Sequence, residues 1–386
     1  MKPIPPFKYC FDEEDSAFIA QGVHDLLQSG NFLTLGRNNE IFEDEFRQAH
    51  GARYAVAVSS GTAALEILLR AVEVAGRKVI MPSNTYGATA VSILHAGGVP
   101  VLAECGEDFS LDPGHVESLL RPDVAAVVVV HIGGAMSAAL PRLLDVCRRH
   151  GIPLIEDAAH ATGASLASRP AGTWGLGGAF SFFSTKVITC GEGGMIVTQD
   201  ARVSDLARLL RNHAKRPNGG MDVIGYNWRL TEIQALVGIA QVRKLSKILE
   251  ERRRVAEGYA SRLRGVSHVS IVPVADDAAP NYYKLLVRLP AGLRDRVRSA
   301  MQDRFAVTLG GEVYAVPCHR QKAFAAYAEG TYPVTDTVCD GHICPPIFPG
   351  MSPAECDHVA TALRTVLIEE LHEWQHSGDV ERDLVR

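Results

Sequence analysis

Three short stretches of the chain combine residue types that can do chemistry. They are Ser59-Ser60-Gly61-Thr62, Glu156-Asp157-Ala158-Ala159-His160 and Ser184-Thr185-Lys186. A glycine and a hydroxyl residue at a helix start can bind an anion, because free N–H groups and the helix dipole point at it. A carboxylate in apolar surroundings needs a partner or becomes protonated. A desolvated lysine has a lowered pKa and can form an imine with a carbonyl.

Ordinary structural roles explain each stretch better than a functional role does when it is taken alone. The Gly61–Thr62 segment fits a plain helix N-cap, Asp157 fits a structural salt bridge, and Lys186 fits a surface cation. Tyr86 follows an apolar run that ends at Met81. It fits either a packed core aromatic or a ring that stacks on a ligand. A joint site therefore depends on whether the fold brings these residues together.

The apolar runs around these stretches predict a sheet that would do so. Because short continuous strands alternate with helices, we expect an α/β fold with a mostly parallel sheet flanked by helices. Ligands bind beyond the carboxyl ends of such strands. An anion site, a carboxylate and a lysine at one edge match what pyridoxal 5′-phosphate (PLP) needs for its phosphate, ring nitrogen and aldehyde. The expected strands are 54–58, 78–81, 100–104, 125–131, 153–157, 178–184 and 195–198, and the helices between them 62–74, 88–95, 113–120 and 140–150.

The remaining segments predict a second, smaller domain. An amphipathic helix at 15–28 leads into the sheet region, and a long helix starts near Thr231 and passes Glu250. A strand at 282–289 and a helix at 294–305 follow it. We expect residues 1–250 to form a large PLP-binding α/β domain with an N-terminal lead-in, and residues 251–386 a small C-terminal α+β domain.

Composition excludes several classes of protein. The chain has 386 residues, a formal net charge of -5 and 22% charged residues, so it lacks the basic footprint of a nucleic-acid binder. A secretory leader and an apolar run of membrane-spanning length are both missing, which favours a cytoplasmic protein without a membrane partner. The eight cysteines form no C-x-x-C pair and the fourteen histidines no metal-binding spacing. We expect reduced thiols and no metal.

Motifs for other chemistries are missing as well. The chain has no G-x-x-x-x-G-K-[ST] loop and no G-x-G-x-x-G after a strand, which argues against nucleotide or NAD binding through those loops. It also has no G-x-S-x-G elbow of a serine hydrolase.

The ordered motifs resemble those of the DegT/StrS-type sugar aminotransferases, which belong to the fold type I, aspartate aminotransferase-like class of PLP enzymes. The resemblance covers nearly the whole chain. It is carried by Ser60-Gly61-Thr62-Ala63-Ala64-Leu65, Glu156-Asp157-Ala158-Ala159-His160, Phe180-Ser181-Phe182 with Lys186, Gly191-Glu192-Gly193-Gly194, and Gly225-Tyr226-Asn227-Trp228-Arg229.

The resemblance implies a role for each site residue. Lys186 would hold PLP as a Schiff base and shuttle a proton at the substrate carbon, while Asp157 would pair with the pyridine nitrogen. His160 would lie near the phenolic oxygen of the cofactor, and Tyr86 would stack on its ring. Asn227 would reach the cofactor phosphate of a neighbouring subunit, which implies a homodimer with shared active sites. The residues expected to hold the phosphate are Gly61, Thr62 and Ser181, with Ser60 beside them.

The resemblance also implies the reaction. We expect an aminotransferase that moves nitrogen from glutamate or glutamine to a keto sugar, one linked to a nucleotide. Tyr314 and His319 lie where the family borders its sugar-nucleotide site, so they are candidate substrate contacts, and a packing role fits them almost as well. The alternatives are a keto-cyclitol substrate, a sugar dehydratase and a regulatory homologue. Lys186 argues against the dehydratase, because those relatives carry histidine in its place.

Overall fold

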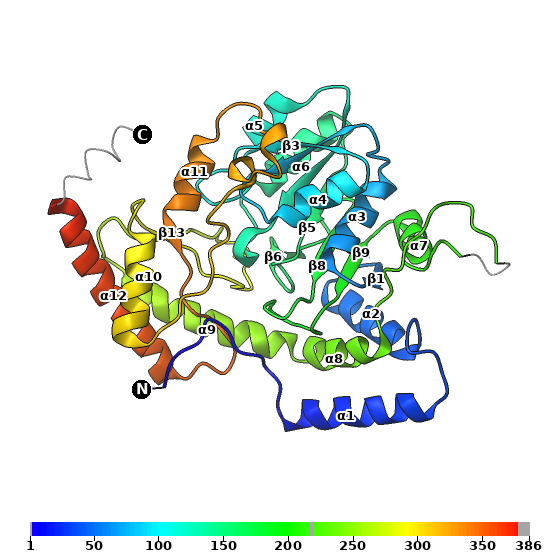
Figure 1. The fold of residues 1–386 in the computed structure, drawn as a ribbon, viewed down its shortest axis with the longest axis horizontal. Coiled ribbons are helices and arrows are strands. Elements are labelled where there is room, and N and C mark those ends of the chain that lie inside the picture. Colours follow the sequence, from blue (N-terminus) through cyan, green and yellow to red (C-terminus); the bar gives the residue numbers. More distant parts are fainter. Residues whose placement is uncertain (1, 216–218, 377–386) are drawn as a thin grey trace.

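The computed structural model describes residues 2–215 and 219–376, and its centre is a seven-stranded sheet with the strand order β1-β9-β8-β5-β4-β2-β3 (Figure 1). Every neighbouring pair is parallel except the two pairs that contain β9. The other six strands therefore end at the same edge, and the expected mostly parallel sheet is confirmed. The strands are β1 (Tyr54–Val58), β2 (Lys78–Pro82), β3 (Val99–Ala103), β4 (Val124–Val130), β5 (Leu154–Asp157), β8 (Gly177–Ser181) and β9 (Gly194–Thr198).

Helices cover both faces of this sheet, and alternate strand residues point to opposite faces. Along β4, Val127 and Val129 belong to the core under α2, α5, α6 and α8, whereas Ala126 and Val128 belong to the core under α3, α4 and α7. The helices are α1 (Glu13–Gln28), α2 (Arg37–Ala49), α3 (Gly61–Ala71), α4 (Gly87–His95), α5 (Pro113–Leu119), α6 (Leu140–Arg149), α7 (Ala201–Leu210) and α8 (Glu232–Arg243).

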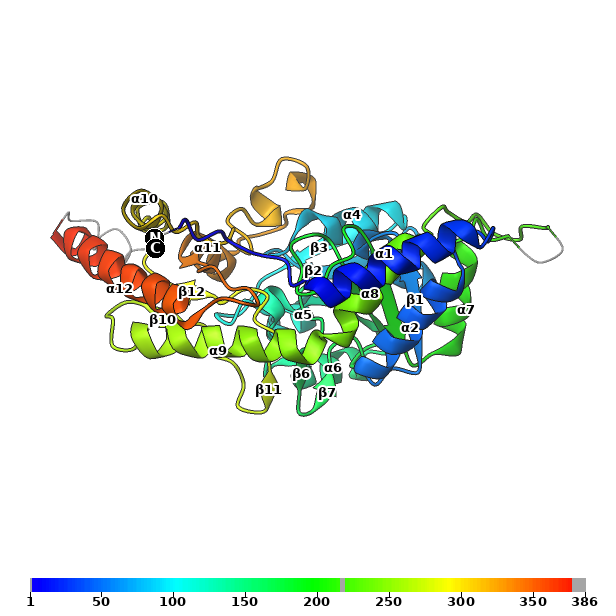
Figure 2. The same ribbon diagram turned by 90° about the horizontal axis from the view of Figure 1, so that it is seen from below.

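The long helix expected from Thr231 past Glu250 is divided in two. Thr231 caps α8, and a second helix, α9 (Leu245–Leu263), follows after Lys244. Lys244 has a ψ of 2°, which lies outside the helical range. Its ammonium pairs with Asp12 and Asp15 at the start of α1, so the break lies where α1 is attached. Figure 2 shows α1 lying alongside α8.

Most of the C-terminal elements share a core of their own with α9 and the N-terminal Ile4, whereas Val338 and Cys339 of α11 (Pro333–Asp340) belong to a core of the sheet region. The strand expected at 282–289 is reduced to two residues, because the backbone of Asn281 and Lys284 bonds to Gly134 and Gly133 instead of to a strand. The division near residue 250 stays a prediction, since α9 runs across it. The elements here are α10 (Arg294–Phe305), α11 (Pro333–Asp340), α12 (Pro353–His376) and the small sheet of β10 (Ser270–Ile271), β12 (Val287–Arg288) and β13 (His342–Ile343).

The remaining elements are short. They are the small sheet of β6 (Ser165–Leu166), β7 (Arg169–Pro170) and β11 (Ala278–Ala279), and three single turns at Ile132–Gly134, Cys318–Arg320 and Ala325–Tyr327. Within residues 2–215 and 219–376, no helix is both long and apolar enough to cross a membrane.

Candidate active site

A cavity of about 450 Å³ lies at the edge where the strands end, and we call it the sheet-edge cavity. It receives residues that follow four different strands, β1, β2, β5 and β8, together with two tyrosines from the C-terminal half of the chain. Nine of the eleven residues predicted for the site line it: Ser60, Gly61, Thr62, Tyr86, Asp157, His160, Ser181, Lys186 and Tyr314.

One end of the sheet-edge cavity is the first turn of α3. The Ser60 hydroxyl accepts the Ala63 N–H at 3.1 Å, so the side chain of Ser60 is the helix N-cap. The N–H groups of Gly61 and Thr62 remain free within the described chain, as expected for a first helical turn. A Cβ on Gly61 would come within 2.9 Å of the Ser181 Cβ. Glycine therefore lets Ser181 approach the helix start, and this end can bind a phosphate.

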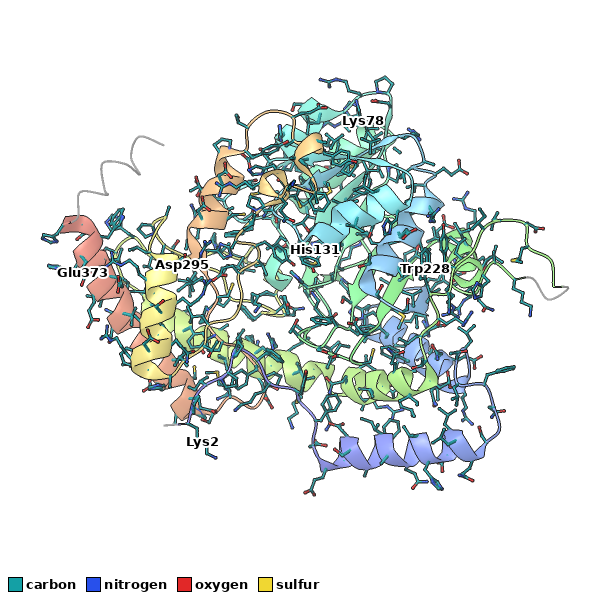
Figure 3. All side chains as sticks on the ribbon, viewed as in Figure 1. Lys2, Lys78, His131, Trp228, Asp295 and Glu373 are labelled. Carbon is teal, nitrogen blue, oxygen red and sulfur yellow. The ribbon has the colours of Figure 1, made fainter. Side chains whose placement is uncertain are left out.

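The adjacent carboxylates of β5 point to different environments. Glu156 is fully buried and accepts hydrogen bonds from His131, which lies in the interior of the molecule (Figure 3), and from the backbone of the 172–175 turn. Asp157 lines the cavity and accepts from the Thr89 hydroxyl at 2.8 Å and the Ala159 N–H at 3.2 Å. Burial raises the pKa of Asp157. A cation in the cavity beside it would keep it ionised.

Lys186 lies in the turn after β8, where its N–H donates to the Phe183 carbonyl at 2.9 Å. Its ammonium is 4.8 Å from the centre of the Tyr283 ring. Burial lowers the pKa of Lys186 to about 8, and Asp157 opposes that shift. A lysine with such a pKa has a large neutral fraction near pH 8 and can act as a nucleophile and as a base.

His160 and Tyr314 form a pair on another wall of the cavity. Their Nε2 and hydroxyl are 3.0 Å apart, and the His160 Nδ1 is buried without a partner. Burial lowers the pKa of His160 well below its usual range and raises that of Tyr314, so both are neutral. In the tautomer in which the tyrosine hydroxyl donates to Nε2, the ring proton is on Nδ1 and is an unused donor.

Two predicted residues do not line the cavity. Asn227 is exposed and pairs through its backbone with Asn212. Both ring nitrogens of His319 are engaged, Nδ1 with Ser83 at 2.8 Å and Nε2 with Asp336 at 2.9 Å. His319 also stacks on Tyr332. The packing interpretation accounts for all of its contacts in the described chain.

Several lining residues escaped prediction from the sequence. Thr89 could have been found, because it comes one helical turn after Tyr86 at the start of α4 and so near the end of β2. Tyr283 belongs to no motif and reaches the cavity through long-range packing. Asn281 holds that segment, since its amide donates to the carbonyls of His160 and Thr162.

The residues present fit PLP. The α3 turn with Ser181 suits its phosphate, Asp157 suits the ring nitrogen, and Lys186 suits the aldehyde. The unused Nδ1 donor of His160 suits the phenolic oxygen, which is the acceptor that this buried nitrogen lacks. In the same described residues, no group of three potential metal ligands occurs, and all eight cysteines are free thiols.

Comparison with known proteins agrees with this arrangement. The model of the DegT/DnrJ/EryC1/StrS aminotransferase family matches residues 13–364. The chain is 32% identical to a UDP-N-acetyl-3-dehydro-alpha-D-glucosamine 3-aminotransferase from Acidithiobacillus ferrooxidans, over 90% of this chain and 94% of that protein. It is 34% identical to GDP-perosamine synthase from Caulobacter vibrioides, over 87% and 91% of the two chains. The crystal structure of S. venezuelae DesV with a ketimine intermediate superposes with a TM-score of 0.89 at 32% identity, covering 95% of this chain and 99% of DesV.

Proposed function

Because the chain belongs to the DegT/DnrJ/EryC1/StrS aminotransferase family, whose members depend on PLP, we propose that it transfers an amino group to the keto carbon of a nucleotide-linked sugar. The predicted family, fold, cofactor and aminotransferase activity are confirmed. The sugar substrate is supported by the names of the relatives, two of which act in nucleotide-sugar chemistry. The amino donor that we propose is glutamate or glutamine.

One observation on the structure of this chain supports the proposal most strongly. Lys186 and Asp157 share a cavity with a free helix start, and the pKa of Lys186 is lowered to about 8. When bound, PLP supplies an electrophilic carbon for an amine and a ring that accepts electrons. Asp157 holds the proton on the ring nitrogen, and Lys186 carries a proton to and from the reacting carbon. The Nδ1–H of His160 orients the phenolic oxygen.

We also propose that two copies of the chain share active sites. Large apolar side chains are strongly exposed at the ends of two loops, with Phe32 at 88% and Ile224 at 82% of their full exposure. Leu33 in the first loop and Met221 and Val223 in the second are exposed as well, so each loop carries a group of apolar side chains of the kind found at contact surfaces. Asn227 follows Ile224 closely and does not line the sheet-edge cavity of its own chain. This is expected for a residue that reaches the cofactor phosphate in the active site of the partner chain. The cytoplasmic location stays a prediction.

Complementation tests the shared site. Lys186→Ala and Asn227→Ala should each be inactive alone. When the two variants are refolded together, a mixed dimer contains one site with both native residues, and activity should return. Activity that stays absent in a mixed dimer of verified composition would contradict the role of Asn227 across the interface.

The substrate is tested with the enzyme in its pyridoxamine form. A panel of nucleotide-linked keto sugars and keto-cyclitols is mixed with it, and the return of the PLP absorbance is followed. We expect a nucleotide-linked keto sugar to react fastest. A faster reaction with a free keto-cyclitol would overturn the proposed substrate class and leave the aminotransferase activity intact.

A further inference from the structure

A second cavity adjoins the first, and we call it the adjoining cavity. Its volume is about 300 Å³. Thr185, Lys186, Tyr283 and Tyr314 line both cavities, so they form a common wall. A ligand in the adjoining cavity is therefore separated by this wall alone from the cofactor site, and Lys186 borders it directly.

The adjoining cavity is positively charged. Arg252 and Lys284 both line it, together with Lys8 from the N-terminal segment. Lys8 is paired with Glu355 at 3.4 Å and lies over the Phe348 ring, so its charge is partly balanced. The carboxylate on the wall, Glu312, is already paired with Arg298.

The other two cations form no salt bridge within residues 2–215 and 219–376, although the charge of Glu312 acts on Lys284 without direct contact. Arg252 is 5% exposed and uses Nε and Nη2 to bind the carbonyls of Tyr282 and Tyr283, which leaves Nη1 without a hydrogen bond. The ammonium of Lys284 has no hydrogen bond or ion pair, and its centre of charge lies 5.5 Å from the Tyr283 ring. Burial lowers the pKa of both groups. Two unpaired cations in such a place destabilise the fold unless an anion joins them.

From this arrangement we propose that Arg252 and Lys284 bind a carboxylate of the amino donor while its amine reacts at the cofactor held by Lys186. The inference rests on the proposed function, since an aminotransferase must bring its amino acid donor to the same reactive carbon of the cofactor as the keto sugar. Arginine and lysine are the usual partners of carboxylates in binding sites. A volume of about 300 Å³ is at the small end for ligand pockets and suits an amino acid better than a nucleotide-linked sugar.

The test uses the PLP-loaded enzyme and the variant Lys284→Met. Binding of glutarate, a dicarboxylate without an amine, is measured by calorimetry, and conversion by L-glutamate is followed by the loss of PLP absorbance. A hydrogen bond to a charged group accounts for about 10- to 100-fold in affinity. We expect a loss of that size in glutarate affinity and a rise of that size in the half-saturating glutamate concentration, and Lys284→Arg should restore both.

Controls separate this subsite from other effects. Lys78→Met removes a cation that pairs with Asp123 at the periphery of the molecule (Figure 3), and it should change neither measurement. The reaction of the pyridoxamine form with the keto sugar should be unchanged in Lys284→Met. A variant with native glutarate and glutamate affinities, or with a defect confined to the sugar reaction, would overturn the proposed subsite.

Failure of the proposed function gives a different result. In that case the wild-type enzyme would not be converted by any amino acid, whereas glutarate binding would still report on Lys284 directly. In such a protein, glutarate binding that depends on Lys284 would support the carboxylate subsite, whereas the lack of conversion would contradict the proposed transamination.

Discussion

The two cavities beside Lys186 differ in how they can hold negative charge. The sheet-edge cavity offers backbone N–H groups at the start of α3 and hydroxyls such as Ser181 for an anion, while its carboxylate, Asp157, suits a cationic group. The adjoining cavity offers the formal cations Arg252 and Lys284. The first is suited to a phosphate that stays bound, because its donors are fixed by the backbone. The second is suited to the carboxylate of a substrate, because the side chains of Arg252 and Lys284 can pair with it directly.

Lys186, which does the chemistry, therefore belongs to both cavities, whereas each anion is bound in one of them. Lys186 lies on the common wall, so a change there should affect both cavities, whereas a change at a residue that lines one cavity alone should affect that cavity.

The largest effect is expected for Lys186→Ala. Loss of a general acid–base group slows a reaction by about 10²- to 10⁴-fold, and here the group that holds the cofactor is lost as well. We expect transamination to fall by about 10⁴-fold or more while PLP still binds noncovalently through the α3 turn. Turnover measured by coupled assay, with PLP content measured in parallel, checks both parts. Turnover that remains near the native rate would refute the role of this lysine.

Asp157 and Glu156 offer a matched pair of neighbouring carboxylates. Asp157→Asn removes the charge that holds the ring proton, so we expect a rate lower by about 100- to 1,000-fold with little change in stability. Glu156→Gln places an amide among four donors in the core, so we expect a loss of about 3 kcal/mol in the free energy of unfolding. Denaturant titration and single-turnover kinetics on both variants check this contrast. Equal stability losses would contradict it.

A smaller effect is expected for Ser181→Ala. One hydrogen bond to the phosphate would be lost at a helix start that keeps its N–H donors, so PLP affinity should fall by about 5- to 100-fold. Glutarate binding in the adjoining cavity should not change. Equilibrium dialysis against PLP measures the first quantity, with Ser118→Ala on the exposed α5 as the control. If Ser181→Ala binds PLP with native affinity, the Ser181 hydroxyl does not contribute to binding of the phosphate.

The sequence predicted one cavity far better than the other, for a physical reason. Gly61, Asp157 and Lys186 follow strands, and parallel strands bring their carboxyl ends together wherever the sheet forms. Tyr283 and Lys284 are brought in by a segment without regular secondary structure, held by Asn281 and by backbone bonds to Gly133 and Gly134. The approach depends on Gly134, where a side chain would collide with Asn281. No periodicity in the sequence reports such a contact.

The same limit applies to His319. Its position after Tyr314 in a motif made it a candidate substrate contact or a packing residue, and a motif does not say which way a side chain points. In the described chain its ring contacts Ser83, Asp336 and Tyr332, and of these Ser83 lies far from it in the sequence.

The measurement that tests the central claim most directly is the pH dependence of cofactor fixation on the apoenzyme. PLP is added at a series of pH values, borohydride is added after short times, and the modified peptide is identified by mass spectrometry. The amine must be neutral to react, and burial lowers the pKa of Lys186 from 10.5 to about 8. The initial rate should therefore rise with pH, reach half its maximum near pH 8 and level off above it, with the label on Lys186. A label on another lysine, or a rate that is still rising near pH 10, would contradict the account.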